Sequence, residues 1–284
     1  MSHIGVVGVV GVGRMGAPIA ARLEHAAQLV LRFDIDPTRG AVADVASVDV
    51  LLTILPGLAE LQDVAPAAIA QLRPGALWID LTSGDPRTSL ALASRADIDV
   101  VVAPMGGGVA AAAAGTLRFF VGGPAAAVER ARPVLEALGT LDHVGEGVGD
   151  GQTAKLIANL LWFGQVVAVS EALLLGQALG IPPARLRQTL AASAAGSVFI
   201  DEYLDALFAG DYLESFGIDR VVEELDTLVS LARDTTVPFE LSTHVRRLHR
   251  EALERFGAID GELLAAKLLE ERAGATLRGV TPPA

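Results

Sequence analysis

A glycine-spaced segment near the beginning of the chain constrains the fold more than any other feature. The apolar, β-branched run Val6–Val10 predicts a buried parallel strand, and it ends in Gly11-x-Gly13-x-x-Gly16. A helical pattern follows the glycines, and a second apolar run then stops at Asp34, eighteen residues after Gly16. Strand, glycines, helix, strand and terminal acid in this order predict a dinucleotide-binding βαβ unit.

Each of these residues has a separate role in holding a dinucleotide. Gly11 permits the tight turn, Gly13 lets the backbone approach a pyrophosphate, and Gly16 lets the helix pack against the strand. The helix N-terminus offers N–H groups and a partial positive charge to the phosphates. Asp34 can accept hydrogen bonds from both ribose hydroxyls and would repel a 2′-phosphate, so we predict NAD in preference to NADP. The alternative is a doubly wound sheet whose glycine turn binds nothing.

Composition narrows the class of protein. A chain of 284 residues, about half of them apolar, is long enough for two domains with a large core. The net charge of −12 argues against nucleic acid or an anionic membrane as a partner. The chain has no cysteine, which excludes disulfides and thiol chemistry. Residues 1–20 show no export signal, so we expect a soluble cytoplasmic enzyme.

One long apolar stretch, Leu156–Leu179, needs a separate explanation. It contains the polar residues Asn159, Gln165, Ser170, Glu171 and Gln177. We therefore interpret it as a buried or interface helix and not as a membrane span.

The order of the patterns predicts two domains of different class. Strand and helix patterns alternate through residue 144, which is typical of a doubly wound parallel sheet, and include a short helix from Pro37 to about Ala46. The glycine-dense run 145–151 marks a boundary, and strand patterns cease after it. We predict an NAD(P)-binding Rossmann domain over 1–148 and an all-helical domain over 149–284. The terminal residues 279–284 are expected to be disordered.

The predicted loops at the carboxyl ends of the strands are where ligands bind in such a sheet. Besides the first glycine loop, these are Leu55-Pro56, Thr82-Ser83 and Pro104–Gly108. A turn between strand and helix remains an equal interpretation of the glycine triplet in the last of them.

The second domain begins with a lysine and an asparagine on one helix face. Lys155 and Asn159 are four residues apart, so an amine and a carboxamide could hold one carbonyl oxygen. Spacing alone favours a snorkelling lysine and an interhelix hydrogen bond of the asparagine. The chain has twenty arginines but only two lysines, Lys155 and Lys267, so a retained lysine is of interest.

Other chemistries find little support. The five histidines are scattered and lack metal-ligand spacing, so we expect no metal site, and there is no nucleophile elbow. Glu223, Glu224 and Asp226 flank an apolar helical stripe and are expected on a solvated face.

Four motifs together resemble the β-hydroxyacid dehydrogenases, the family of 3-hydroxyisobutyrate dehydrogenase and tartronate semialdehyde reductase. The resemblance spans nearly the whole chain. The motifs are Gly11-Val-Gly-Arg14-Met15-Gly16-Ala-Pro18, Asp80-Leu-Thr-Ser83-Gly-Asp-Pro86, Ala103-Pro-Met-Gly106-Gly107-Gly108 with its continuation to Gly123, and Gly147-x-Gly149 followed by Lys155-x-x-x-Asn159.

The resemblance implies reversible hydride transfer between NAD(P) and a small β-hydroxy acid or its semialdehyde. Lys155 would handle the proton on the reacting oxygen, since desolvation lowers the pKa of a lysine and its ammonium form stabilises an alkoxide. Asn159 would orient the substrate, and the backbone of Gly106, Gly107 and Gly108 would receive its carboxylate. A homodimer or higher homo-oligomer is implied as well. The residues implied to contact the cofactor are Gly11, Gly13, Arg14, Met15, Gly16, Asp34, Leu55, Pro56 and Ser83.

The chain departs from the family pattern at two places. Val102 and Gly106 stand where the family usually has an acid and a serine, and Glu223-Glu224 stand where it has Lys-Asp. These changes favour a bulkier or differently charged substrate, with Trp162 and Phe163 as candidate walls for it.

Two alternative functions remain. An imine reductase has a related fold, but such enzymes generally lack a lysine at the position of Lys155. A Rossmann protein that binds NAD without turnover, acting as a sensor, would fit the lost serine and the Glu223-Glu224 replacement.

Overall fold

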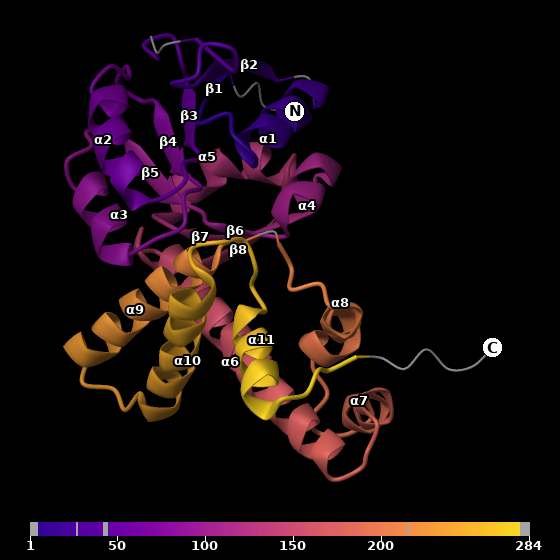
Figure 1. Cartoon of the computed structure of the whole chain (residues 1–284). Helices are drawn as coiled ribbons and strands as arrows, with labels where there is room; N and C mark the ends of the chain where they lie inside the picture. The colour runs from indigo at the N-terminus through magenta and orange to yellow at the C-terminus, as the bar shows by residue number, and fades with distance from the viewer. Residues whose placement is uncertain (1–4, 27, 42–44, 215, 279–284) are drawn as a thin grey trace. The chain divides into compact units, whose positions relative to one another are not determined.

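The computed structural model describes residues 5–26, 28–41, 45–214 and 216–278. The chain divides into two compact units, Met1–Leu156 (unit 1) and Ile157–Ala284 (unit 2). Figure 1 colours unit 1 from indigo to magenta and unit 2 from magenta-red to yellow. The terminal residues 279–284, for which we predicted disorder, lie outside the described residues.

Unit 1 is built on one mixed sheet. Among the residues described, the sheet has eight strands: seven follow the order β2-β1-β3-β4-β5-β7-β6, and the eighth, β8, pairs with β7. The order reverses at β1, which lies between β2 and β3, and such a switch point is where ligands bind in doubly wound folds. The strand bounds are β1 (Val6–Val10), β2 (Leu29–Phe33), β3 (Val50–Thr53), β4 (Leu77–Asp80), β5 (Asp99–Val102), β6 (Met105–Gly106), β7 (Leu117–Gly122) and β8 (Gly139–Gly145).

The sheet is mostly parallel, as predicted, and is mixed at one edge. Strands β1 to β5 are parallel, as expected, but β7 is antiparallel to β5 and β6. The reason is that the two-residue strand β6 pairs directly with β7, Met105 opposite Phe119 and Gly106 opposite Arg118. The chain therefore enters β7 in the opposite direction, and β8 then lies parallel to it.

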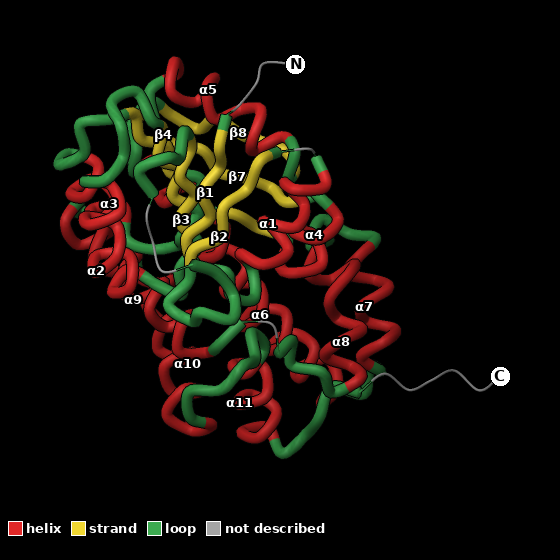
Figure 2. The backbone as a smooth tube through the Cα atoms, turned by 90° about the horizontal axis from the view of Figure 1, so that it is seen from above, coloured by secondary structure: helices red, strands yellow, loops and turns green. Residues whose placement is uncertain are grey.

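Helices cover both faces of the sheet, which confirms the doubly wound class. One core cluster joins the sheet to α1, α4 and α5, and a second joins its other face to α2 and α3. Figures 1 and 2 show α2 and α3 together on one side of the strands, with α1 and α4 on the other. The helix bounds are α1 (Gly16–His25), α2 (Leu58–Ile69), α3 (Pro86–Ala93), α4 (Gly108–Ala114) and α5 (Ala125–Glu136).

One local prediction in unit 1 needs correction. The segment from Pro37 forms turns and not a helix as far as Ala41, which instead makes an isolated bridge with Phe33; residues 42–44 are outside the described part. The side chain of Asp36 accepts hydrogen bonds from the backbone and hydroxyl of Thr38, so a turn replaces the helical start. In contrast, the alanine run 110–114 is helical and lies in α4.

The described part of unit 2 is helical, as predicted. Helix α6 (Asp150–Ala178) begins in unit 1 and continues into unit 2, and Gly180, at a φ of 88°, follows its end. One turn of this unit, η1, is π-helical and is followed directly by α8. The remaining bounds are α7 (Pro183–Ala191), η1 (Phe199–Tyr203), α8 (Leu204–Ala209), α9 (Ile218–Asp234), α10 (Glu240–Phe256) and α11 (Leu264–Ala273).

Helix α6 is long and apolar enough to cross a membrane by length and composition, and a third of its most apolar window is buried. Core helices of soluble proteins have the same properties, and its buried face includes the polar side chain of Ser170.

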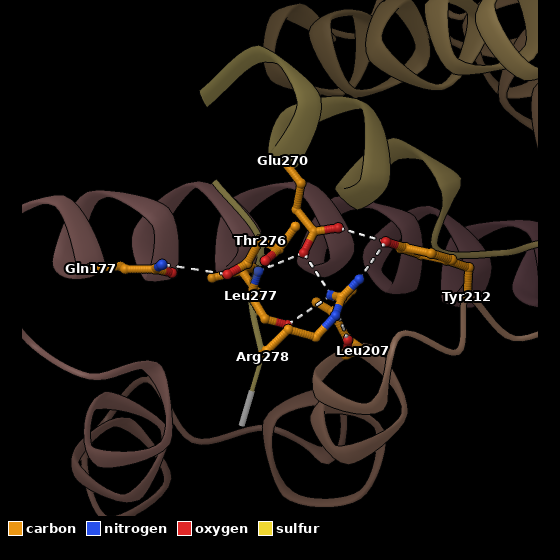
Figure 3. A network of polar contacts seen from close by, with 7 residues as sticks. All are labelled: Gln177, Leu207, Tyr212, Glu270, Thr276, Leu277 and Arg278. Carbon is orange, nitrogen blue, oxygen red and sulfur yellow. Dashed lines mark hydrogen bonds and ion pairs between the residues drawn. The ribbon is translucent and has the colours of Figure 1, made fainter. Parts of the chain in front are cut away.

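A polar network holds the C-terminal segment against unit 2 (Figure 3). The buried carboxylate of Glu270 accepts hydrogen bonds from the Tyr212 hydroxyl at 2.7 Å and from the backbone N–H of Leu277 at 2.5 Å. Arg278 forms an ion pair with the same carboxylate at 3.0 Å and also bonds the carbonyl of Leu207. The network joins α11, α8 and the segment after α11.

Candidate active site

The first glycine loop, between β1 and α1, has the geometry that a dinucleotide requires. Gly11 has a φ of 89°, and a Cβ there would collide with the carbonyl oxygen of Ile54. A Cβ on Gly16 would collide with the carbonyl oxygen of Gly11. A Cβ on Gly13 would meet nothing within 4 Å, so the backbone borders open space at the position where a pyrophosphate approaches. These residues fit the phosphates of NAD(P).

Asp34, directly after β2, is joined to this loop. Its Oδ2 accepts a hydrogen bond from the backbone N–H of Val12 at 2.6 Å, and its Oδ1 accepts one from Asp36 at 2.9 Å. The carboxylate therefore has a fixed orientation beside the glycines. Of the other residues predicted to contact the cofactor, Met15 packs against the core and Arg14 is exposed.

A buried polar network supports the next two loops at the carboxyl ends of β3 and β4. Thr53 donates to Asp80 at 2.7 Å, and Trp78 donates through its indole N–H to the Thr53 hydroxyl at 3.0 Å. The backbone N–H of Thr82 also donates to Asp80, and burial raises the pKa of the Asp80 carboxyl to about 6. The Thr82 hydroxyl accepts a bond from the Leu55 N–H at 3.2 Å, which links the two loops.

The loops that contain the predicted residues Leu55, Pro56 and Ser83 are thus tied to each other. Leu55 and Ser83 are half-buried, whereas Pro56 is exposed. Their role in binding a cofactor stays a prediction.

Gln152, in the first turn of α6, was missed by sequence analysis. Its side chain is fully buried, donates to the carbonyl of Thr82 at 2.6 Å and accepts from the N–H of Gly84 at 3.0 Å. The amide therefore fastens the loop after β4 to the helix that carries Lys155. A polar residue on an apolar helix gives no periodic signal, although its place just after a glycine run could have suggested a contact with a loop.

Lys155 lies beside the third predicted loop. Its Nζ is 3.9 Å from the position that a Cβ on Gly106 would occupy, and it lies over the ring of Phe120, 5.9 Å from the centroid. All three residues belong to unit 1, so the structure brings Lys155 to the glycine triplet of the predicted substrate loop. An ammonium over an aromatic face is stabilised by the ring quadrupole.

The other two glycines of the triplet have backbone conformations that suit glycine. Gly107 and Gly108 have φ values of 116° and 67°, and Gly107 precedes the first residue of α4. A Cβ on Gly108 would meet nothing within 4 Å. The predicted turn between strand and helix therefore exists, and it leaves the backbone accessible.

Asn159 lies in unit 2, one helical turn after Lys155 on α6. Its Nδ2 donates a hydrogen bond to Glu224 of α9 at 2.6 Å. A carboxylate only accepts, so the contacting atom of the amide must be its nitrogen. The interhelix hydrogen bond considered for Asn159 is thus present.

The expectation of a solvated face for the acidic cluster on α9 is wrong for Glu224. Glu224 is buried, because its side chain faces Asn159 and not solvent. Glu223 is exposed and pairs with Arg220 at 2.9 Å, whereas Asp226 pairs with Arg246 and Arg250 of α10. Helical spacing alone could not distinguish these three positions.

The two aromatic residues suggested as substrate walls have different environments in unit 2. Trp162 makes edge contacts with Phe199 and Tyr203, at centroid distances of 5.3 and 4.7 Å, and donates to Glu262 at 3.1 Å. Phe163 is buried in the core, with its ring centroid 5.6 Å from that of His249. The structure therefore does not support the prediction that Phe163 lines the substrate site.

Two family models match the chain. Residues 6–149 match the NAD-binding domain of 6-phosphogluconate dehydrogenase, and residues 149–269 match the model described as NAD-binding of NADP-dependent 3-hydroxyisobutyrate dehydrogenase. The chain belongs to the 3-hydroxyisobutyrate dehydrogenase, or β-hydroxyacid dehydrogenase, family of NAD(P)-dependent enzymes that act on CH–OH groups.

Curated relatives agree with this assignment. A probable 3-hydroxyisobutyrate dehydrogenase of Mycobacterium tuberculosis is 37% identical over 62% of this chain, and that match spans 65% of the relative's length. The 3-hydroxyisobutyrate dehydrogenase of Pseudomonas aeruginosa is 34% identical over 69% of this chain and 72% of its own. An NAD-dependent L-serine dehydrogenase of the same organism is 32% identical, with the same shares of both chains covered.

Solved structures resemble the chain as well. The 3-hydroxyisobutyrate dehydrogenase of M. tuberculosis, solved with L-serine, has a TM-score of 0.84 and 26% identity, covering 93% of this chain and 99% of the other. An imine reductase of Streptomyces aurantiacus shares the fold, with a TM-score of 0.60 and 20% identity over 93% of this chain and 99% of its own.

Proposed function

We propose that this chain is an NAD-dependent dehydrogenase of small 3-hydroxy acids in which Lys155 is the acid/base. The observation that carries the proposal is the position of the Lys155 Nζ beside Gly106, in a unit whose sequence matches an NAD-binding family. The substrate class follows from relatives that are named for 3-hydroxyisobutyrate and L-serine, which both bear a hydroxyl and a carboxylate.

The roles of the residues follow from their chemistry. The nicotinamide cofactor supplies or accepts the hydride when bound. Lys155 takes the proton from the substrate hydroxyl in oxidation and returns it in reduction, and as an ammonium it stabilises a developing alkoxide. Backbone N–H groups at Gly107 and Gly108 receive the substrate carboxylate, and Asn159 orients the substrate while Glu224 fixes its amide.

We infer a preference for NAD over NADP from Asp34. Its carboxylate is held beside the glycine loop by the N–H of Val12, where ribose hydroxyls can bind and a 2′-phosphate is repelled. We expect Asp34→Ala to narrow the ratio of the two dissociation constants by about tenfold, the effect of losing one charge-assisted contact. Equal affinity of the unaltered protein for NADH and NADPH, measured by fluorescence titration, would refute this use of Asp34.

We also propose a homodimer assembled through α6. Ile157, Leu161 and Leu175 are exposed on this helix, at 49%, 63% and 63%, and an exposed apolar stripe of this length marks an association surface. Sedimentation of the purified protein should give twice the monomer mass or more, and a monomer at micromolar concentration would contradict it. We expect the enzyme to act in the cytoplasm, although one relative is a mitochondrial protein.

A substrate panel tests the proposed function. Hydroxy acids, their semialdehydes and cyclic imines are offered with NAD(H) or NADP(H), and NADH or NADPH absorbance is followed. We expect turnover of 3-hydroxy acids with NAD. Turnover of imines alone would make the chain an imine reductase, and tight NADH binding without any turnover would make it a sensor.

A further inference from the structure

We propose that Arg118 determines substrate specificity by binding a second carboxylate, so that the preferred substrates are 3-hydroxy acids with two carboxylate groups. The inference rests on the proposed function and names its substrate class more closely. Arg118 lies in β7, and neither the sequence analysis nor the family assignment gives it a role.

The pairing of β6 with β7 places Arg118 next to the Lys155 site. Arg118 is the antiparallel partner of Gly106, and directly opposed residues of two strands project from the same face of a sheet. Lys155 Nζ lies 3.9 Å from the Cβ position of Gly106, on the side to which a side chain there would project. Arg118 therefore emerges on the face of the sheet that carries Lys155.

The ring of Phe120 joins the two cations. Phe120 follows Arg118 by two residues in β7 and so shares its face. The guanidinium carbon of Arg118 is 5.8 Å from the centroid of this ring, and Lys155 Nζ is 5.9 Å from it. Two cationic groups within 6 Å of one ring form a local positive region in a protein whose net charge is −12. Such a region attracts a ligand with more than one negative charge.

Gly106 leaves room for a larger substrate. Within 4 Å, a Cβ at this position would meet only Lys155 Nζ, so the space beside the reacting amine is open. A substrate substituent can occupy that space, and the residue directly across from it on the neighbouring strand is Arg118. The open space at Gly106 and the positive charge of Arg118 therefore lie next to each other beside Lys155.

Arg118 has a loose intramolecular partner. Its Nη2 is 3.7 Å from the Asp142 carboxylate, longer than a charge-assisted hydrogen bond, and both side chains are more than half exposed. An exposed ion pair of this kind contributes little to the stability of the folded protein. A substrate carboxylate can bind the guanidinium through two parallel hydrogen bonds, and Asp142 is then its competitor.

The test compares two substrates in four proteins. The substrates are 3-hydroxyisobutyrate, with one carboxylate, and 2-(hydroxymethyl)glutarate, with two. The proteins are the unaltered enzyme, Arg118→Met, Arg118→Lys and Asp142→Asn, and kcat and KM are measured for each with NAD. Methionine retains an apolar chain over Phe120 without the charge. Lysine retains the charge but lacks the planar guanidinium that can form two parallel hydrogen bonds with a carboxylate.

We expect the unaltered enzyme to favour the dicarboxylate in kcat/KM. Arg118→Met should lower kcat/KM for the dicarboxylate by about 10- to 100-fold, mainly through KM, and change the monocarboxylate less than threefold. Arg118→Lys should restore part of the loss, and Asp142→Asn should improve the dicarboxylate about two- to fivefold.

Equal losses for both substrates in Arg118→Met, or no preference in the unaltered enzyme, would overturn the assignment of Arg118 and leave the proposed function intact. Absence of turnover with every hydroxy acid would instead contradict the proposed function itself.

Discussion

The two lysines of the chain occupy contrasting regions. Lys267, on α11 in unit 2, lies between two aromatic rings, with Nζ 5.2 Å from the centroid of Tyr212 and 4.9 Å from that of Phe256. Lys155, in unit 1, lies over the ring of Phe120 and also approaches Gly106. One ammonium lies over two aromatic rings, whereas the other lies over one ring and beside the glycine loop.

The difference extends to the surroundings. The region near Lys267 contains the network of Glu270, Tyr212 and Arg278, in which each polar group has a protein partner (Figure 3). The region near Lys155 presents glycine backbone and loops tied down by Gln152. A rigid frame around an accessible group is what catalysis requires, and a closed set of contacts is what stability requires.

The largest effect should separate the two lysines in activity. We expect Lys155→Ala to lower kcat by about 10²- to 10⁴-fold with near-normal NADH binding, because the acid/base is lost. Lys155→Arg should be similarly impaired, since arginine retains the charge but does not release its proton. Lys267→Met is the matched control and should stay within about threefold of the unaltered enzyme. A larger kcat loss in Lys267→Met than in Lys155→Ala would reverse the comparison.

The next effect concerns the buried titratable groups of the two units. Burial raises the pKa of Asp80 from 3.8 to about 6 and lowers the pKa of His249 in unit 2 from 6.5 to about 4. The free energy of unfolding therefore decreases as the pH rises through 6, because the buried Asp80 carboxyl must then lose its proton. It also decreases as the pH falls from 6.5 towards 4, because the buried imidazole of His249 resists protonation. Each amounts to about 3 kcal/mol, and the two trends oppose each other.

Single variants should expose these opposing trends in urea unfolding between pH 4 and 7. Asp80→Asn should leave a protein whose free energy of unfolding falls more steeply towards pH 4 than that of the unaltered protein. His249→Gln should leave one that loses stability as the pH rises from 4 to 6. Parallel pH profiles in all three proteins would show that neither burial penalty exists.

A smaller effect should come from the C-terminal network. Arg278→Ala leaves the buried Glu270 carboxylate with only the Tyr212 hydroxyl and the Leu277 N–H as its donors among the contacts described. We expect a loss of about 2 kcal/mol in unfolding free energy, less than for a fully buried pair because Arg278 is partly exposed. Activity at 25 °C should be unchanged. A loss of kcat without a loss of stability would place this network in the functional machinery.

The smallest effect should come from Gln152. In Gln152→Glu an oxygen can still accept the hydrogen bond from the Gly84 N–H. The second carboxylate oxygen replaces the NH2 group that donates to the Thr82 carbonyl, so the loop after β4 is held less firmly. We expect kcat to fall about tenfold while KM for the substrate changes little. Gln152→Asn should impair the enzyme less if a water bridges the gap. An unchanged kcat in both variants would make the bridge purely structural.

The sequence predicted the frame of the site better than its details. The glycine loop, the alternation of strands and helices and the long α6 follow from periodicity and spacing, because local patterns determine them. The direction of β7, the buried bridge of Gln152 and the burial of Glu224 depend on contacts between distant segments. Arg118 and Phe120 likewise come beside Lys155 only through strand pairing and a helix start far along the chain.

Chemical rescue of Lys155→Ala shows whether the amine of this residue carries the proton in catalysis. Small primary amines, such as methylamine and ethylamine, are added to the variant at saturating NAD and substrate, and kcat is measured against the concentration of the free amine. We expect kcat to rise with the free amine in Lys155→Ala and to show no such rise in Lys267→Met. A Lys155→Ala enzyme that works within a fewfold of the unaltered protein without any amine would contradict it.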